Sequence, residues 1–519
     1  MLAVVNSFGL VGLEGYKIDV EVDVNMGLPK YEIVGLPDAS VKEAKERVRS
    51  AIKNSGFKFP SGRITVNLAP ANKKKEGSGF DLAMAVAILF ATEQLNIKKT
   101  NKFIFLGELG LDGSLKAVNG LLPMLISARA EGYNDFIIPA QNMQEASYID
   151  GTNVYALNNF KDVINFLSGE LNFLPIEKKE WKCEGVKASE DFARVKGQAV
   201  AKRAMEIAVA GGHNILMVGP PGSGKTMLAH CVPSILPDLT FEEALEITKI
   251  HSVAGVLDLK KGIVTSRPFR SPHHTASTVA LTGGGKSVLP GEISLAHNGV
   301  LFLDEMPEYS RDTLETLRQP LEDGCITVSR ASGTVVYPAN FILIASMNPC
   351  PCGNFGSKDL ECTCSPSQIQ RYMRKISGPL LDRIDIKIDV DRVTFVDLNS
   401  DKEEESSAEV KKRVDRARKV QLERYKNDKN YSNAKMNSKQ IKLYCKIDDD
   451  TRDFMEQAFE KFHMSARAYN RILKVARTIA DLEGKENIEF EHVAEALAYR
   501  TIETVSYTHL RAHETRRHL

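Results

Sequence analysis

The spacing of apolar positions over residues 1–168 predicts an α/β domain. Residues 18–24 alternate apolar and polar side chains, as a half-buried strand does. Apolar residues recur at helical spacing over 40–55, and 81–91 is apolar throughout, as in a buried helix. Short apolar runs bounded by turn residues predict further strands at 64–68, 103–108 and 136–139, and one more helix at 121–131.

Four segments with different patterns follow residue 168. Residues 169–190 carry several charges and few apolar side chains, so we interpret them as a linker. Residues 191–390 alternate short apolar runs with helical patterns, which indicates a second α/β unit with a parallel sheet. Residues 391–505, with a charged helix over 407–425, predict a helical domain. Residues 506–519 have no apolar period and resemble translated adapter sequence, so we exclude them as a non-native tail.

Composition fixes the class of protein but not its partner. A chain of 519 residues exceeds one hydrophobic core, and its 43% hydrophobic and 26% charged content is that of a soluble globular protein. The net charge of +1 neither indicates nor excludes nucleic acid, which would need a local basic surface. The longest apolar run, 82–91, is too short for a bilayer, and the N-terminus lacks a basic leader. We therefore expect a cytoplasmic protein with no membrane partner and with reduced cysteines.

One segment fits the phosphate-binding pattern G-x-x-x-x-G-K-[ST], after an apolar strand at 214–218 and before a helix. Backbone N–H groups of such a loop bind phosphates at the start of the helix. Lys225 would reach the β- and γ-phosphates, and the Thr226 hydroxyl would ligate Mg²⁺. The segment reads Gly219, Pro220, Pro221, Gly222, Ser223, Gly224, Lys225, Thr226.

An acidic pair supports nucleotide hydrolysis. The apolar strand at 300–303 ends in Asp304 and Glu305, which would hold Mg²⁺ and polarise the attacking water respectively. The alternative is that Asp304 only caps the next helix. A second glycine-rich segment, 283–287, has Ala280 where a phosphate loop needs its first glycine, so we interpret it as a flexible loop carrying Lys286.

Four of the eight cysteines form two C-x-C pairs, nine residues apart. Four thiolates can close a tetrahedral Zn²⁺ site, although C-x₂-C is the usual spacing. Reduced cysteines in a loop, or a redox pair, remain alternatives. The residues are Cys350, Cys352, Cys362 and Cys364.

Further segments resemble the AAA+ ATPases. Gln198 ends a segment that resembles the adenine-side motif, and Asn348 ends one that resembles the sensor-1 strand, where it would orient the lytic water. Arg383 lies in a segment that resembles the one presenting an arginine finger to a neighbouring subunit, and Arg467 begins one that resembles the sensor-2 helix. A surface salt bridge is the alternative for each arginine taken alone.

Two insertions resemble the magnesium-chelatase and MCM-like branch of that class: a helix-2 insert around 283–286 and a hairpin from residue 324 onward. Lys286 and Arg330 are then candidates for contacting nucleic-acid phosphates in a central channel, with simple solvation as the alternative. Another cluster could bind phosphate or a metal, or could only pack within the insert: Arg270, His273 and His274.

Residues 1–505 together resemble the ComM (YifB) family. The resemblance implies a Lon-protease-like N-terminal α/β domain, an AAA+ P-loop core with a parallel sheet, and a C-terminal helical lid. It also implies ATP and Mg²⁺ as cofactors and assembly into a homohexamer. The implied function is a DNA helicase that promotes branch migration when incoming DNA recombines in natural transformation, on single-stranded or branched DNA without sequence specificity.

The same resemblance argues against proteolysis. Lon-type proteases use a Ser–Lys dyad. Here the nucleophile position falls on Gly79, with Ser78 one residue away, and the lysine position falls on Leu122. We therefore expect the N-terminal domain to be proteolytically inactive. Residues 73–75, three lysines beside this loop, are either solvated or touch DNA backbone.

Other functions remain open at this point. A magnesium-chelatase-type motor that remodels a protein partner predicts ATPase activity indifferent to DNA. An ATP-dependent Lon-like protease predicts a reactive Ser78. An ATP-dependent assembly scaffold predicts nucleotide binding with very slow turnover.

Overall fold

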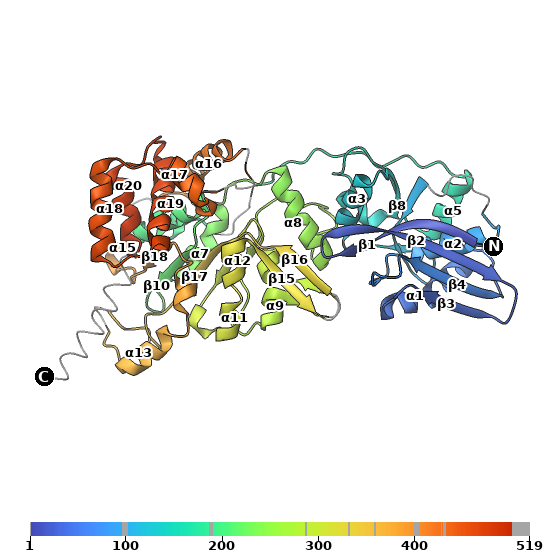
Figure 1. The fold of residues 1–519 in the computed structure, drawn as a ribbon, viewed down its shortest axis with the longest axis horizontal. Coiled ribbons are helices and arrows are strands. Elements are labelled where there is room, and N and C mark those ends of the chain that lie inside the picture. The colour runs from blue at the N-terminus through green and yellow to red at the C-terminus, as the bar shows by residue number, and fades with distance from the viewer. Residues whose placement is uncertain are drawn as a thin grey trace.

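A computed structural model describes most of the chain. Figure 1 shows an elongated molecule with an α/β unit at the N-terminal end, a helical unit at the other end and a second α/β unit between them. The structure describes residues 2–95, 102–185, 190–285, 288–330, 333–357, 360–398, 404–426, 428 and 432–500. Lys286 and the tail at 506–519 lie outside these ranges.

The N-terminal unit is built on a seven-stranded mixed sheet of order β3-β4-β2-β1-β5-β8-β9. β1 and β2 form an antiparallel hairpin, β2 and β4 are antiparallel, and the remaining neighbours are parallel. The strands are β1 (Leu2–Val11), β2 (Glu14–Asn25), β3 (Lys30–Val34), β4 (Arg63–Ala69), β5 (Phe103–Phe105), β8 (Asp135–Pro139) and β9 (Asn153–Leu157). A short antiparallel pair, β6 (Glu108–Leu109) and β7 (Leu115–Lys116), lies beside it.

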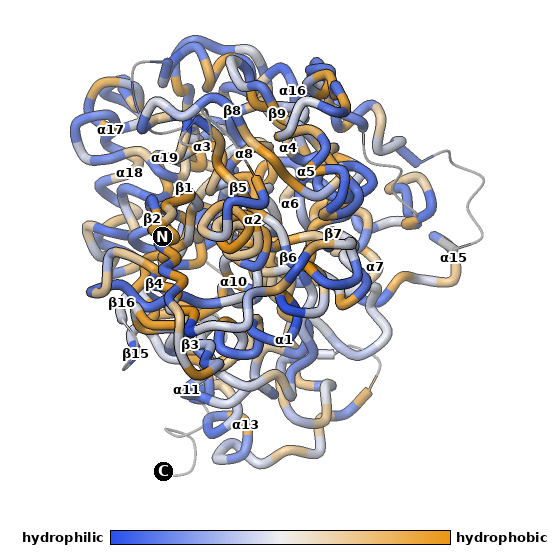
Figure 2. Tube along the Cα trace, turned by 90° about the vertical axis from the view of Figure 1, so that its right-hand side faces the viewer, coloured by the Kyte–Doolittle hydropathy of each residue, from blue (hydrophilic) through white to orange (hydrophobic). Residues whose placement is uncertain are grey.

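Both faces of this sheet are covered. Alternate residues of β1 belong to two different hydrophobic clusters. Val5 is in the cluster that includes residues of helices α1 and α2, and Phe8 is in the cluster that includes residues of helix α3. Helix α2 is apolar on all sides because it is buried, as the orange tube in Figure 2 shows. The helices are α1 (Ala39–Asn54), α2 (Asp81–Ala91), α3 (Leu121–Ala130), α4 (Met143–Ala146) and α5 (Phe160–Ser168).

The central unit contains a five-stranded sheet of order β11-β14-β17-β10-β18, with every neighbouring pair parallel. This order brings the carboxyl ends of β14, β17 and β10 side by side, and polar residues follow each of them. The strands are β10 (Ile215–Val218), β11 (Phe269–Arg270), β14 (Val300–Leu303), β17 (Ile342–Met347) and β18 (Ile386–Asp389). Both expected insertions form β-ribbons: β12 (Gly283–Gly284) with β13 (Leu289–Pro290), and β15 (Cys325–Arg330) with β16 (Gly333–Pro338).

The central unit also contains a series of helices, several of them short. They are α6 (Ala199–Gly211), α7 (Lys225–Cys231), α8 (Phe241–Ala254), α9 (Thr278–Thr282), α10 (Glu292–Leu295), α11 (Arg311–Glu315), α12 (Arg318–Asp323), α13 (Pro366–Met373), α14 (Gly378–Leu381) and α15 (Phe395–Leu398).

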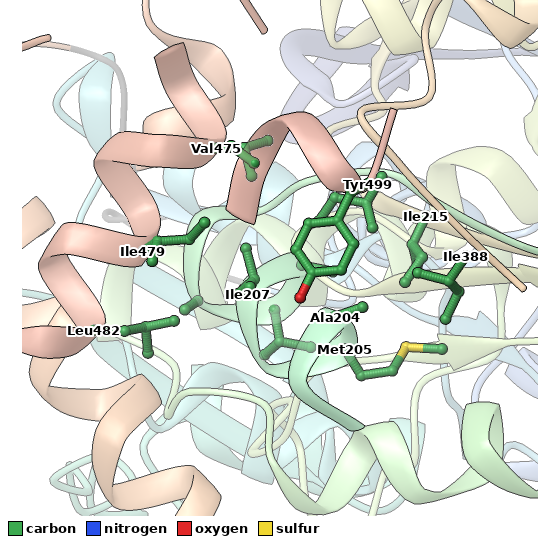
Figure 3. Packing of buried hydrophobic residues seen from close by; sticks show 14 of the residues in the cluster. Ala204, Met205, Ile207, Ile215, Ile388, Val475, Ile479, Leu482 and Tyr499 are labelled. Atoms are coloured by element: carbon green, nitrogen blue, oxygen red, sulfur yellow. The ribbon is translucent and has the colours of Figure 1, made fainter. Parts of the chain in front are cut away.

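The C-terminal helices pack on the central unit through one continuous hydrophobic cluster. Figure 3 shows Ile479 and Leu482 of α19 near Ile207 of α6, with Ile215 and Ile388 of the sheet beyond. These helices are α16 (Ser407–Arg424), α17 (Ser438–Tyr444), α18 (Asp449–Lys461), α19 (Ala466–Glu483) and α20 (Phe490–Ala498). Over the part of the chain that is described, none of the helices is both long and apolar enough to cross a membrane.

Helix α8 joins the two α/β units, as its place in Figure 1 shows. The backbone N–H of Gly120, at the start of α3, donates to the Ser252 carbonyl at 3.0 Å. The buried Glu145 carboxylate accepts from the Ser252 hydroxyl and from the Leu122 backbone N–H. Burial raises the pKa of Glu145. A second contact places Gly12, in the β1–β2 turn, against Val335 of β16.

Candidate nucleotide site

The phosphate-binding pattern occupies the turn between β10 and α7, as its sequence context requires. Gly222 and Gly224 take positive φ values of 76° and 88°, which residues with a Cβ adopt at a cost. A Cβ at Gly219 would lie 2.2 Å from the Val390 carbonyl oxygen, so that position accepts only glycine. Gln198 reaches the loop from the side, where its Nε2 donates to the carbonyl oxygens of Ser223 at 3.3 Å and Asp391 at 2.6 Å.

Lys225 lies inside this loop with 8% of its surface exposed. Its Nζ donates to the carbonyl oxygens of Gly219 at 2.7 Å and Pro220 at 2.9 Å, and lies 3.4 Å from Asn348 Oδ1. Burial lowers the pKa of Lys225, while Asp304 and Glu305 oppose that shift. The lysine is therefore positioned where phosphate oxygens would compete with the loop carbonyls for its protons.

Asp304 is oriented by two hydroxyl groups. Thr226 Oγ1 donates to Asp304 Oδ2 at 2.8 Å, and Ser346 Oγ donates to the other carboxylate oxygen. A hydroxyl and a carboxylate oxygen side by side are hard oxygen donors of the kind Mg²⁺ takes. Both residues expected to hold Mg²⁺ are thus together, and the chemistry of the donors fits the ion.

Glu305 follows in a left-handed conformation, with φ at 49°, which is uncommon outside glycine and concentrates at functional sites. Its backbone N–H donates to Asp304 Oδ1 at 3.1 Å and to Ser346 Oγ at 3.2 Å. This turn leaves the Glu305 side chain half exposed beside the loop. Together with Asn348, it completes a set of polar groups from the ends of three adjacent strands.

His274 is a residue of this site whose partner the sequence did not identify. Its Nδ1 lies 3.9 Å from Glu305 Oε2, and its ring packs against His273 at 4.1 Å between centroids. Arg270, grouped with these histidines from the sequence, instead forms a two-bond ion pair with Glu292 at 2.6 Å. Arg270, His273 and His274 were grouped because they are close in sequence, but only the fold shows that His274 is the one that faces Glu305.

The two expected arginines lie together at a different place. Arg383 donates to the Glu322 carboxylate and, at 2.7 Å, to the Pro379 carbonyl oxygen. Arg467 Nη2 lies 3.8 Å from the other Glu322 oxygen. The structure therefore brings Arg467 to the arginine-finger candidate. Among the contacts of the described residues, neither arginine reaches Lys225 of the same chain.

The four clustered cysteines also meet, with all four Sγ atoms within 4.8 Å of one another. Hydrogen bonds from the backbone, the Asn354 N–H above all, lower the pKa of Cys352 to about 5. The thiolate form that a metal requires is favoured at Cys352, whereas burial raises the pKa of Cys362.

Three polar residues of the N-terminal unit, Ser78, Asp81 and Lys75, each have a partner within that unit. Ser78 Oγ donates to the Glu108 carboxylate, and the pairings of the described residues include no Ser78–lysine contact. Asp81 is paired with Arg47 at 2.7 Å. Lys75, suggested as a possible DNA contact, is fully buried and donates to the carbonyl oxygens of Pro70 and Lys73, so it cannot touch DNA in this conformation.

Comparison with known proteins decides the family. Competence protein ComM of Haemophilus influenzae is 45% identical over 506 residues, which cover 96% of this chain and 98% of that protein. The chain belongs to the ComM (YifB) family. Protein YifB of Salmonella typhimurium is 43% identical, with 97% of each chain covered. Lon protease 2 of Bacillus subtilis is 26% identical over 182 residues, 32% of each chain.

Three segments match families described for magnesium chelatase. "Magnesium chelatase, subunit ChlI" matches residues 191–398, "Subunit ChlI of Mg-chelatase" matches 20–142, and "Magnesium chelatase, subunit ChlI C-terminal" matches 404–500. The ComM family is thus magnesium-chelatase-like, with an AAA+ core that implies ATP and Mg²⁺ as cofactors and ATPase activity.

Proposed function

We propose that this ComM-family chain is an ATP-driven DNA motor that assembles as a homohexamer. In this proposal it acts as a helicase that promotes branch migration when incoming DNA recombines. The name of the Haemophilus relative, a competence protein, supports a role in DNA uptake. The magnesium-chelatase-like core supports the ATPase part.

Each residue of the nucleotide site has a proposed role in hydrolysis. Lys225 and the loop bind the phosphates, Thr226 and Asp304 hold Mg²⁺, and Gln198 borders the adenine side. Glu305 accepts the proton of the attacking water, and Asn348 orients that water. The contact between Asn348 Oδ1 and Lys225 Nζ, at 3.4 Å, supports this assignment because it places both groups at one point.

The ring is proposed from the two arginines. Arg383 and Arg467 share Glu322 in this chain, so both could turn to the nucleotide of a neighbouring subunit at an assembled interface. A guanidinium there would stabilise the charge that develops on the γ-phosphate. Hydrolysis would then require assembly, since one chain supplies the phosphate loop and the next supplies the arginines.

One observation carries the DNA part of the proposal: the two β-ribbon insertions meet. The Arg330 guanidinium, at the end of β15, lies 2.9 Å from the position a Cβ would take at Gly284 of β12. Arg330 is exposed, and among the described residues it has no carboxylate partner. An exposed cation where two loops converge suits a phosphate backbone, with affinity that falls steeply with salt.

The test is the steady-state ATPase rate of the full chain at low salt, with and without single-stranded and branched DNA. We expect a several-fold stimulation by DNA that Arg330→Glu removes while the basal rate remains. Arg452→Glu, a change at an exposed arginine of α18, is the matched control and should keep the stimulation. Lys225→Ala and Glu305→Gln should lose all turnover.

A robust rate unaffected by DNA would refute the DNA motor. It would favour a magnesium-chelatase-type motor acting on a protein partner, the alternative that the three family matches support. Location in the cytoplasm stays a prediction from sequence.

A further inference from the structure

The segment between Asn348 and α13 packs against the phosphate-binding loop. Gly353, in the middle of the cysteine cluster, has a φ of 81°, and a Cβ there would lie 2.4 Å from Pro221 Cδ. Cys350 is only two residues beyond Asn348 and is completely buried. The cysteine segment is therefore continuous with one wall of the nucleotide site and in contact with another.

The sulfur positions have the spacing of a single metal site. Cys350 Sγ lies 3.3 Å from Cys352 Sγ and 3.7 Å from Cys362 Sγ, and the latter two are 3.6 Å apart. Four sulfurs at Zn–S bond lengths of about 2.3 Å around one ion are about 3.8 Å apart, whereas a disulfide requires about 2.0 Å. All eight cysteines are free. The arrangement matches a tetrahedral four-thiolate site.

The backbone around the cluster is fixed as a metal-binding loop requires. The Phe355 N–H donates to Cys350 Sγ at 3.3 Å, which compensates part of the charge of a thiolate. The Gly353 N–H donates to the Cys350 carbonyl oxygen at 3.0 Å and closes a tight turn between the first two ligands. Directly after Cys364, Ser365 begins α13 with a capping box, so the exit of the loop is also set.

We propose that Cys350, Cys352, Cys362 and Cys364 bind one Zn²⁺, and that this zinc site holds Gly353 against Pro221 to keep the phosphate-binding loop in its nucleotide-binding shape. Few apolar side chains support the loop, and a tetrahedral ion ties its two C-x-C pairs together. Loss of the ion would free Gly353 and with it the wall formed by Pro221. The second half of the proposal rests on nucleotide binding by this loop, but not on any action on DNA.

Zinc content is measured first, on the full chain purified under reducing conditions and analysed by plasma mass spectrometry. We expect about one zinc per chain, lost in Cys352→Ser/Cys362→Ser and kept in Cys183→Ser/Cys325→Ser, where the cysteines are half-buried but lie outside the cluster. Iron in place of zinc, or no metal in the unmodified chain, would overturn the metal assignment.

The contact with Pro221 is tested with two alanine variants of the same loop. Gly353→Ala and Gly356→Ala share a left-handed backbone, with φ of 81° and 77°, but only Gly353 faces an atom within 4 Å. We expect both variants to keep zinc, and only Gly353→Ala to weaken binding of fluorescent mant-ATP with Mg²⁺, by about tenfold, because small displacements of positioning groups have large effects.

Removal of zinc by the double serine variant should weaken mant-ATP binding in the same direction. Equal nucleotide affinity in the two alanine variants would refute the support of the phosphate loop, whatever the zinc content. Neither readout involves DNA, so the proposed motor can fail while this inference holds, and the reverse.

Discussion

Each of the two α/β units contains a buried lysine held in nearly the same way, Lys75 and Lys225, yet only Lys225 belongs to a candidate active site. Lys75 and Lys225 are 0% and 8% exposed. Each donates from Nζ to two backbone carbonyl oxygens a few residues upstream, and burial lowers the pKa of each. Burial and carbonyl contacts alone therefore do not distinguish a functional lysine from a structural one.

The difference lies in what else surrounds each ammonium group. Lys225 has Asn348 at 3.4 Å and the charges of Asp304 and Glu305 nearby, from the ends of two other strands. The charged neighbour of Lys75 is another cation, Lys73, which lowers its pKa further. A buried lysine that faces an acidic pair from one strand and an amide from another can bind a phosphate with its metal ion, whereas one enclosed by carbonyls only holds a loop.

The largest expected effect separates these two lysines. Lys225→Met should abolish ATP turnover, because the phosphates lose their cation. Lys75→Met should leave turnover within about twofold and lower the melting temperature, because each buried acceptor left without a donor costs about 1–3 kcal/mol. Turnover and thermal unfolding of both variants measure this. Loss of turnover in a folded Lys75→Met protein would show that the N-terminal lysine takes part in the chemistry.

The next effect tests whether the nucleotide site is completed by a second copy. Arg383→Ala should reduce turnover by about 10³-fold, the range of an arginine finger. Mixing Arg383→Ala with Lys225→Met subunits should restore part of the rate, since an intact loop then meets an intact arginine across one interface. If mixtures shown to co-assemble recover no activity, Arg383 would contribute to the stability of its own subunit through Glu322, and not to a site shared between subunits.

A smaller effect concerns His274, which lies 3.9 Å from Glu305. His274→Ala should lower kcat by about tenfold and leave mant-ATP affinity unchanged, because an orienting partner of a reacting group typically contributes one to two powers of ten. His273→Ala is the control, since that ring bonds to Thr275 at 2.8 Å and faces no acidic residue of the site. Equal rates in both variants would remove His274 from the proposed mechanism.

Sequence patterns predicted the helices and strands whose apolar residues repeat with one clear period. Helix α2 matches its expected range of 81–91, and α1, α3, β4 and β8 differ from expectation by at most one residue at either end. Three strands of the seven-stranded sheet, β1, β3 and β9, were not predicted. β1 does not alternate apolar and polar residues, because both of its faces are buried, so its burial pattern lacks the period of two that marks a strand.

The candidate site was predictable to the extent that its chemistry is local in sequence. The phosphate loop with Lys225 and Thr226, and the pair Asp304 and Glu305, each form one short motif. The pairing of His274 with Glu305, and of Arg383 and Arg467 with Glu322, joins residues 31 or more apart that carry no shared motif. Only the fold brings such residues together, which is why their contacts could not be read from the chain.

The smallest expected effect concerns Asp81, the buried carboxylate of the N-terminal unit, which contrasts with the half-buried Asp304 of the central unit. Burial raises the pKa of Asp81 to about 6, although Arg47 opposes the shift, against an ordinary value of 3.8. The folded state therefore binds more protons than the unfolded chain between about pH 4 and 6. The sign follows: stability increases as pH falls through 6, and the gain is lost again as pH rises.

The expected gain for Asp81 is about 1 kcal/mol between pH 7 and pH 5, a few degrees in melting temperature. The side chain introduced by Asp81→Asn cannot titrate. The melting temperature of the unmodified chain, relative to this variant, should therefore rise as the pH is lowered from 7 to 5. Asp112→Asn, on the surface, is the control, because hydrogen bonds from Ser114 lower the pKa of Asp112 from its ordinary value of 3.8, the opposite direction to Asp81. A flat difference for Asp81→Asn would mean that Arg47 keeps Asp81 ionised throughout. The N-terminal unit would then hold a permanent ion pair. Its carboxylate would resemble Asp304 in charge, but it is buried and faces a cationic side chain, whereas Asp304 is half-buried and faces two hydroxyl groups.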